Sequence, residues 1–134
     1  MSKDTMQIVR EQDVVPFRNR VREFATKIGM SLVNQTKLIT AASELVRNML
    51  KYASGGKVIL EIISKSAQTG VRLTFVDEGP GIKDIKQAMQ DGFSTGRSLG
   101  LGLPGAKRLV NEFDIQSTSG SGTTVTIIHW KHGR

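Results

Sequence analysis

Two stretches in the first half of the chain carry apolar residues three or four positions apart, the spacing that puts them on one face of an α-helix. The first helix is predicted over residues 13–28, with an aspartate as its cap, Pro16 in its first turn and a glycine after it. The second is predicted from a cap at Ser31 or Asn34 to about Ala53. Their apolar faces consist of Phe17, Val21, Phe24 and Ile28, and of Leu38, Ala41, Ala42, Leu45, Val46, Met49 and Leu50.

Alternating or continuous apolar runs predict strands in the rest of the chain, with a turn at Gln68–Gly70. Two further helices are predicted, one over Lys83–Met89 and one from about Leu103 with Pro104 in its first turn. The element order is then β-α-α-β-β-α-α-β-β, which indicates an α/β fold with helices stacked on one face of a mixed β-sheet. The predicted strands are Thr5–Glu11, Lys57–Ser64, Val71–Val76, Phe113–Thr118 and Thr123–Trp130.

Length and composition exclude several classes of protein. The 134 residues suffice for one domain with a core, so we expect a single domain over residues 1–134. No apolar run is long enough to cross a membrane, and none after Met1 resembles a signal peptide. The absence of cysteine excludes disulfides and thiolate metal sites and fits a cytoplasmic location.

The net charge of +7 is compatible with a nucleic acid, a membrane surface, or an anionic ligand and an acidic protein as partner. The basic residues are scattered, and aromatic residues make up only 5% of the chain. A nucleic-acid platform combines clustered basic residues with aromatic side chains, so we expect no nucleic-acid partner and a solvated basic surface.

The segment DEGPGI follows the predicted strand Val71–Val76 directly, so Asp77 stands where the strand ends. Gly79 and Gly81 flank Pro80, which predicts a rigid turn with room for the close approach of a ligand. A carboxylate only accepts hydrogen bonds, so it suits a ligand that donates, such as an adenine amino group. The simpler interpretation is a β-turn with a solvated aspartate.

The second predicted helix contains ELVRNMLKYA, in which Glu44, Asn48 and Tyr52 share one face. They could simply face solvent, with Arg47 and Lys51 as surface charges beside them. The functional interpretation is that Asn48 offers a neutral oxygen to Mg²⁺, which prefers hard oxygen ligands. Glu44, one turn earlier, could then accept a proton from a nucleophile that attacks a metal-bound phosphate.

The segment Asp91–Lys107 is rich in Gly, Ser and Thr and leads into the helix predicted from Leu103. A glycine-rich loop that opens a helix offers free N–H groups and the positive end of the helix dipole to an anion. By itself this signal is weak, because a G-x-G before a helix is common. Gly100 and Gly102 belong neither to a Rossmann fingerprint, which follows a strand directly, nor to a P-loop.

Together, ELVRNMLKYA, DEGPGI and GLGLPGAK resemble, in order and spacing, the N box and two G boxes of the ATP-binding family of gyrase, Hsp90, sensor histidine kinases and MutL. The resemblance spans most of the chain and implies a two-layer sandwich that binds ATP. Within that family the chain is similar to the small anti-sigma-factor kinases. DGFSTGRSLGLGLPGAKRLVNEF is particularly similar to the serine/threonine kinases of bacterial stressosomes.

The resemblance implies how the adenine is bound. Asp77 matches the adenine-binding aspartate, and Gly79 and Gly81 match the turn beneath the base. Ile82 ends the same box and is counted with these cofactor-binding residues. Thr123 matches the hydroxyl that helps the aspartate and a water to recognise adenine.

The resemblance also implies how the phosphates are bound. Asn48 matches the Mg²⁺ ligand and Glu44 the catalytic base, while Lys51 matches a basic position near phosphate. Arg97 is the one cation inside the short glycine-rich lid and is assigned a phosphate contact. The loop around the phosphates is formed by Gly100, Leu101, Gly102 and Leu103.

The function that the resemblance implies is Mg²⁺-ATP-dependent phosphorylation of serine or threonine in a regulatory STAS-domain protein of a stressosome. It also implies that the kinase, once released, activates a PP2C-type phosphatase by binding. The alternatives are an ATPase or a nucleotide-dependent binding module of the same fold without protein kinase activity. A generic α/β binding domain without ATP is the third.

Overall fold

The computed structural model describes residues 2–79, 98–118 and 120–133, with the backbone alone for residues 98–102. In chain order the elements are β1 (Lys3–Ile8), the short 3₁₀ helix η1 (Glu11–Asp13), α1 (Val14–Lys27), α2 (Leu32–Ala53), β2 (Gly56–Lys65), β3 (Gln68–Asp77), α4 (Ser98–Leu109), β4 (Glu112–Thr118) and β5 (Gly122–Trp130). The helix predicted over Lys83–Met89 lies outside the described residues.

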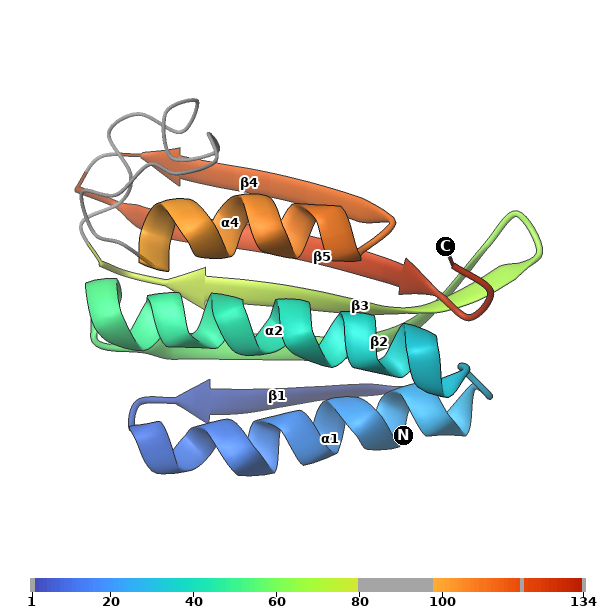
Figure 1. Ribbon diagram of the computed structural model, residues 1–134. Coiled ribbons are helices and arrows are strands. Elements are labelled where there is room, and N and C mark those ends of the chain that lie inside the picture. The colour runs from blue at the N-terminus through green and yellow to red at the C-terminus, as the bar shows by residue number, and fades with distance from the viewer. Residues whose placement is uncertain (1, 80–97, 119, 134) are drawn as a thin grey trace.

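The five strands form one sheet in the order β1-β2-β3-β5-β4. All described strand pairs are antiparallel, so the prediction of a mixed sheet is corrected. The connection from β1 to β2 contains two helices that run in opposite directions, α1 and α2 (Figure 1). The chain therefore reverses three times between the two strands, and β2 lies against β1 in the opposite direction. A crossover with one helix reverses the chain only twice and joins parallel strands.

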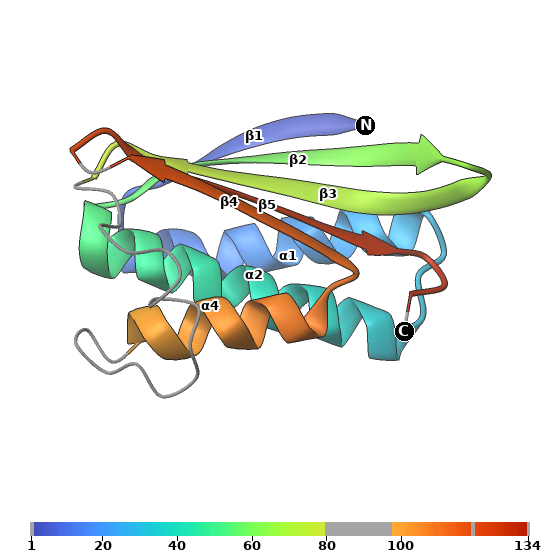
Figure 2. The ribbon, with the colours of Figure 1, turned by 90° about the horizontal axis from the view of Figure 1, so that it is seen from above.

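The described helices lie in one layer against one face of the sheet, as predicted (Figure 2). The predicted apolar faces of α1 and α2 point into the core, where Phe17, Phe24 and Leu38 are fully buried. The rings of Phe17 on α1 and Phe75 on β3 meet edge to face, with centroids 6.1 Å apart. Edge-to-face aromatic pairs stabilise beyond the area they bury, so this contact locks the two layers together.

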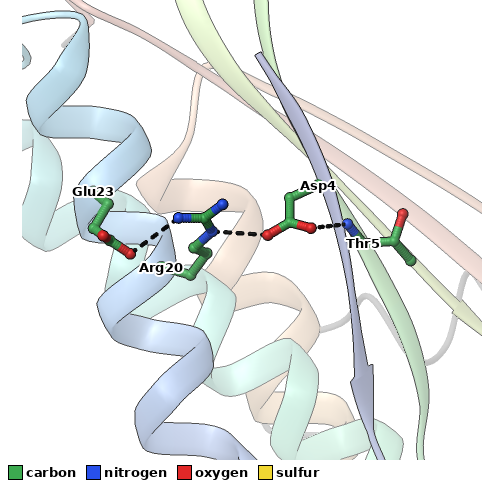
Figure 3. Close-up of polar contacts among 4 residues, drawn as sticks. All are labelled: Asp4, Thr5, Arg20 and Glu23. Atoms are coloured by element: carbon green, nitrogen blue, oxygen red, sulfur yellow. Dashed lines mark hydrogen bonds and ion pairs between the residues drawn. The ribbon is translucent and has the colours of Figure 1, made fainter. Parts of the chain in front are cut away.

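The edge strand β1 is joined to α1 by an ionic contact (Figure 3). The Nε–H of Arg20 donates to Oδ2 of Asp4 at 2.8 Å, and Glu23 lies 3.4 Å from the same guanidinium. The neighbouring guanidinium, followed by the Thr5 N–H bond, lowers the pKa of Asp4. Arg20 also lies over the ring of Phe24, 5.4 Å from its centroid. A strand with one neighbour is thereby held to the helical layer.

The helix caps follow the sequence in part. Ser31 caps α2, because its hydroxyl accepts the N–H of Asn34, and Gly29 follows α1 with φ +79°. Asp13 precedes α1 as predicted, yet its side chain accepts the N–H groups of Val9 and Arg10 at 2.9 and 3.0 Å. These bonds hold the preceding turn and lower the pKa of Asp13.

The turn predicted at Gln68–Gly70 is wrong, because these residues belong to β3. Lys65 pairs with Gln68, which leaves Ser66 and Ala67 as a two-residue hairpin loop. Both have positive φ, 52° and 66°, although neither is glycine or asparagine. Two-residue hairpin loops favour positive φ because turns with these angles match the twist of the flanking strands. Here the pairing of β2 with β3 imposes positive φ on a serine and an alanine, which do not favour it.

The helix predicted from about Leu103 begins earlier, at Ser98. Pro104 therefore lies in the second turn of α4 rather than in the first. The prediction relied on the preference of proline for a first turn and on the low helix propensity of glycine. Packing of α4 against α2 and the burial of Leu103 and Ala106 outweigh these local preferences.

Candidate functional site

One end of the molecule gathers most of the described residues that the sequence singled out. The carboxyl-terminal half of α2, the end of β3, the start of β5 and the start of α4 all lie there, and both views agree (Figures 1 and 2). Because α2 and α4 run antiparallel, the end of one meets the start of the other. Residues from four separate stretches of chain thus face a common region.

Asp77 ends β3, and its carboxylate has a fixed orientation. Its Oδ1 accepts the N–H of Gly79 at 3.0 Å, which closes a tight turn immediately after the strand. A Cβ on Gly79 would meet Cα of Ala53, in the last turn of α2, at 2.8 Å. Only glycine permits this approach, which brings the Asp77 turn against the end of α2.

Thr123 stands beside Asp77 in the sheet, because the two residues are register partners of β3 and β5. The preceding residue, Gly122, has φ +94°, and a Cβ there would collide with the carbonyl oxygen of Asp77. The Thr123 hydroxyl lies 2.8 Å from the Ser117 hydroxyl of β4, which also donates to the carbonyl of Gly122. A carboxylate and two hydroxyls therefore line this part of the site.

Ser117 was missed by the sequence analysis. It lies in an ordinary strand, and only the pairing of Ser117 with Thr123 across β4 and β5 puts it here.

Asn48 and Tyr52, one turn apart on α2, carry buried polar atoms without partners. Asn48 is 8% exposed, and neither its Oδ1 nor its Nδ2 makes a hydrogen bond to any described residue. The hydroxyl of Tyr52 is in the same condition. Buried polar groups are nearly always satisfied, so two such groups on one face indicate that a ligand supplies the partners. The sequence placed Tyr52 on this face but gave it no role.

Glu44 lies one turn before Asn48 and remains accessible. Its side chain is 39% exposed, and Oε1 lies 3.9 Å from a guanidinium nitrogen of Arg47. A long ionic contact of this kind holds a carboxylate weakly. Lys51 is exposed, with its ammonium 5.6 Å from the centre of the Tyr52 ring. Along α2, the accessible carboxylate of Glu44 precedes the unsatisfied Asn48, and the exposed ammonium of Lys51 follows it.

The other predicted site residues divide into two groups. Gly81, Ile82 and Arg97 lie outside the described residues. The predicted phosphate loop differs from the structure, since its residues fall inside α4 and the helix amino terminus lies at Ser98. The Leu103 side chain is 2% exposed and belongs to the core. The backbone of Gly100, Leu101 and Gly102 lies within the first two turns of α4.

Among the described residues, no group of three or more His, Asp or Glu side chains could hold a metal ion. A metal at Asn48 would therefore take most of its ligands from water and from a bound anion, as Mg²⁺ commonly does. No helix in the described part of the chain combines the length and apolarity needed to cross a membrane.

Two named proteins are similar in sequence over most of the chain. It is 42% identical over 125 residues to the serine/threonine-protein kinase RsbT of Bacillus subtilis (strain 168), covering 93% of this chain and 94% of that protein. It is 30% identical over 112 residues to the anti-sigma F factor of Caldanaerobacter subterraneus subsp. tengcongensis, covering 81% of this chain and 78% of that protein.

Solved structures support the fold at lower identity. The RsbU and RsbW domains of a Mycobacterium tuberculosis protein superpose with a TM-score of 0.68 and 21% identity, over 96% of this chain and 32% of that one. The mycobacterial sensor histidine kinase MprB superposes with a TM-score of 0.57 and 17% identity, over 95% of this chain and 96% of that one. Residues 18–134 match the family described as histidine kinase-, DNA gyrase B-, and HSP90-like ATPase, and the chain belongs to this family.

Proposed function

We propose that this protein is a Mg²⁺-ATP-dependent serine/threonine protein kinase that acts within a sigma-factor switch. The observation that carries the proposal is the buried, unsatisfied carboxamide of Asn48, one helical turn from the accessible carboxylate of Glu44. A kinase needs a ligand for the metal ion that binds the phosphates. Close to it, the kinase needs a group that accepts the proton of the substrate hydroxyl. The 42% identity to a serine/threonine-protein kinase supports the same assignment.

Asp77 and Thr123 would bind the adenine of ATP, a cofactor that membership of this ATPase family implies. The Asp77 carboxylate accepts from the exocyclic amino group, and its bond to the Gly79 N–H keeps it oriented for that purpose. Thr123, held by Ser117, adds a hydroxyl beside it. Gly79 is assigned the position beneath the base, and Gly81 and Ile82 are assigned to the same adenine-binding segment.

Asn48 fits a Mg²⁺ site, because its oxygen is buried, neutral and without a partner. Bound Mg²⁺ would offset negative charge on the phosphate oxygens. Glu44 accepts the proton of the acceptor hydroxyl, or orients that hydroxyl, as phosphate is transferred. Lys51 and Arg97 are assigned to the phosphates, together with the backbone N–H groups of Gly100 and Leu101, which lie in the first turn of α4 and have no acceptor within the helix.

The proposed partners are a STAS-domain substrate of a stressosome and a PP2C-type phosphatase regulator. Similarity to RsbT and to anti-sigma F factors supports a role in sigma-factor regulation, and the two specific partner classes come from the sequence resemblance. We further propose one kinase domain over residues 1–134, a cytoplasmic location, and no nucleic-acid or membrane partner.

The test is transfer of label from [γ-³²P]ATP, with Mg²⁺, to a purified STAS-domain protein. We expect label on a serine or threonine of the acceptor. Asp77→Asn should bind ATP about 10- to 100-fold more weakly, because one charge-assisted hydrogen bond is lost. Unchanged ATP affinity of this variant in calorimetry would refute the adenine assignment.

Two outcomes favour the alternatives. Release of free phosphate without acceptor labelling, across a panel of STAS-domain proteins, indicates an ATPase. Nucleotide binding without either reaction indicates a binding module of the same fold.

A further inference from the structure

A cavity lies between α1 and α2, away from the end of the molecule that carries Asp77 and Asn48. Its volume is about 370 Å³. α1 contributes Arg18 and Arg22, one turn apart, and α2 contributes residues from its amino-terminal half. The lining from α2 is Leu32, Gln35, Thr36, Ile39 and Thr40. We call this cavity the α1–α2 groove.

The two arginines of the α1–α2 groove lack an anionic partner among the described residues. Nε of Arg18 is buried and makes no hydrogen bond. Arg22 donates to the neutral amide of Asn19 at 3.1 Å and forms no ion pair with a described carboxylate. On the same helix, Arg20 is paired with Asp4 and Glu23. A buried guanidinium N–H without an acceptor is costly, and a carboxylate is the acceptor that suits its forked geometry.

The start of α2 strengthens the positive field in the groove. This helix has 22 residues, and no acidic residue lies in its first turn. The positive end of its dipole is therefore not offset locally, and it favours a negative group. Leu32, in that first turn, is 79% exposed although it lines the cavity, and Ile39 is 6% exposed. The groove thus joins cationic groups to an open apolar surface.

We propose that the α1–α2 groove docks an acidic, amphipathic segment of a protein partner. Carboxylates of that segment would pair with Arg18 and Arg22, and an apolar side chain would pack on Leu32. A small anion would use the charges but leave Leu32 exposed, and so it fits the groove less well.

The α1–α2 groove leads along α2 toward Glu44. Thr36, Thr40 and Glu44 follow one another at intervals of four residues, so they form one stripe along α2. Thr40 and Glu44 are separated by about 6 Å along the helix axis. A segment docked in the groove would therefore end beside the candidate catalytic base. This last step rests on the proposed function, whereas docking itself does not.

The experiment selects short helical peptides from a displayed library against the intact protein and titrates the synthetic winners by fluorescence anisotropy. We expect carboxylates four residues apart, which match Arg18 and Arg22, and one large apolar residue. Arg18→Gln and Leu32→Ser should each weaken binding about tenfold, as should Glu→Gln changes in the peptide. Lys65→Gln, which removes one positive charge from the exposed end of β2, should leave the affinity unchanged.

Two further readouts separate the possibilities. Binding should shift the Nε–H resonance of Arg18 in NMR spectra, and ATP affinity should be the same for wild type and Arg18→Gln. If Arg18→Gln does not fold, Leu32→Ser and the Glu→Gln peptides still decide the question. Loss of kinase activity alone would count against the proposed function and not against docking.

The proposal is overturned if no selected peptide depends on Arg18 or Leu32, or if Lys65→Gln weakens binding as much as Arg18→Gln. It is also overturned if inorganic phosphate, single-stranded DNA or phosphatidylglycerol vesicles bind through Arg18 while the peptides do not. The second and third of these results would mean that this surface attracts anions in general.

Discussion

Asn48 and Asn34 are a matched pair of buried asparagines on α2. They are 8% and 7% exposed. The Nδ2 group of Asn34 donates to the carbonyl of Gly133 at 2.9 Å, and its Oδ1 lies 2.9 Å from Nε2 of His129. Asn48 has no such partners among the described residues. The hydrogen-bonded Asn34 therefore stabilises the folded protein, whereas the unsatisfied Asn48 destabilises it. Substitutions at the two positions can separate a role in function from a role in stability.

Asn48→Leu should stabilise the nucleotide-free protein by about 1 kcal/mol, because a buried group without partners is replaced by an apolar one of similar shape. The same change should abolish Mg²⁺-dependent ATP binding. Denaturant unfolding without nucleotide measures the first effect, and calorimetry with Mg²⁺-ATP measures the second.

Asn34→Leu is the control and should destabilise the protein by about 1–3 kcal/mol, since it leaves the groups around His129 unpaired. If Asn48→Leu proved equally destabilising, Asn48 would be part of the packing and not a ligand.

Glu44→Gln should separate binding from chemistry. The amide keeps the size of the accessible side chain but cannot take up a proton, so ATP affinity should stay near normal. Phosphoryl transfer should slow by about 10²- to 10⁴-fold, the usual contribution of a general base, with the lower end favoured because proton transfer is late in this reaction. Single-turnover transfer to the acceptor measures the rate. Parallel loss of binding and transfer would assign Glu44 a structural role.

At the scale of elements, the β2–β3 hairpin stores backbone strain. Ser66 and Ala67 both adopt positive φ, a conformation that Asn and Gly tolerate better. Ser66→Asn combined with Ala67→Gly should raise the free energy of unfolding by about 1 kcal/mol without changing the denaturant slope. Equilibrium unfolding in urea tests this expectation.

In the β4–β5 hairpin the opposite substitution, from glycine to alanine at a positive φ, serves as a control for the Ser66/Ala67 variant. Gly120 has φ +84°, and a Cβ there would meet nothing within 4 Å. Gly120→Ala should therefore destabilise the protein by about 1 kcal/mol through backbone strain alone. A stable Gly120→Ala variant together with an unchanged hairpin double variant would show that these φ angles carry little strain.

At the scale of the whole molecule, His129 joins two distant parts of the chain. It lies on β5, is fully buried, and contacts Asn34 at the start of α2, which in turn holds the carbonyl of Gly133. Because the Asn34 amide nitrogen donates to that carbonyl, its oxygen accepts, and Nε2 of His129 carries the proton. Nδ1 is buried and has no hydrogen-bond partner in the described part of the chain. Burial, and then the nearby charge of Lys37, lower the pKa of His129 from 6.5 to about 4.

Folding stability should therefore fall as the pH drops from about 6.5 to about 4. Over that interval the unfolded chain binds a proton at His129 and the folded protein does not, so stability rises with pH. The loss should reach at most about 3 kcal/mol. The lowered carboxyl pKa values of Asp4 and Asp13 act below this interval, since their stabilisation is lost only as the pH falls below 3.8.

Thermal unfolding across this pH range tests the prediction, with His129→Gln as the variant that cannot titrate. That variant should lose the pH dependence between 6.5 and 4 even if it is less stable throughout. An equal slope in both proteins would mean that His129 does not cause it.

The sequence alone determined the parts of this protein whose cause is local. Side-chain periodicity predicted α1 and α2, because one buried stripe suffices to specify an amphipathic helix. A carboxylate at a strand end and the glycines after it marked Asp77 and Gly79 as candidate site residues, whereas Thr123 came from the family resemblance. The two-layer architecture and the family followed from the order of these motifs.

Tertiary structure decided what depends on partners far away in the chain. The antiparallel pairing of β1 with β2 comes from the two helices between them, and the turn at Ser66–Ala67 is imposed by strand register against local preference. The start of α4 follows from its packing on α2. The contrast between Asn48 and Asn34 is of the same kind. Whether a buried amide is satisfied depends on which distant groups the fold brings within hydrogen-bonding distance, and no local pattern in the sequence records that.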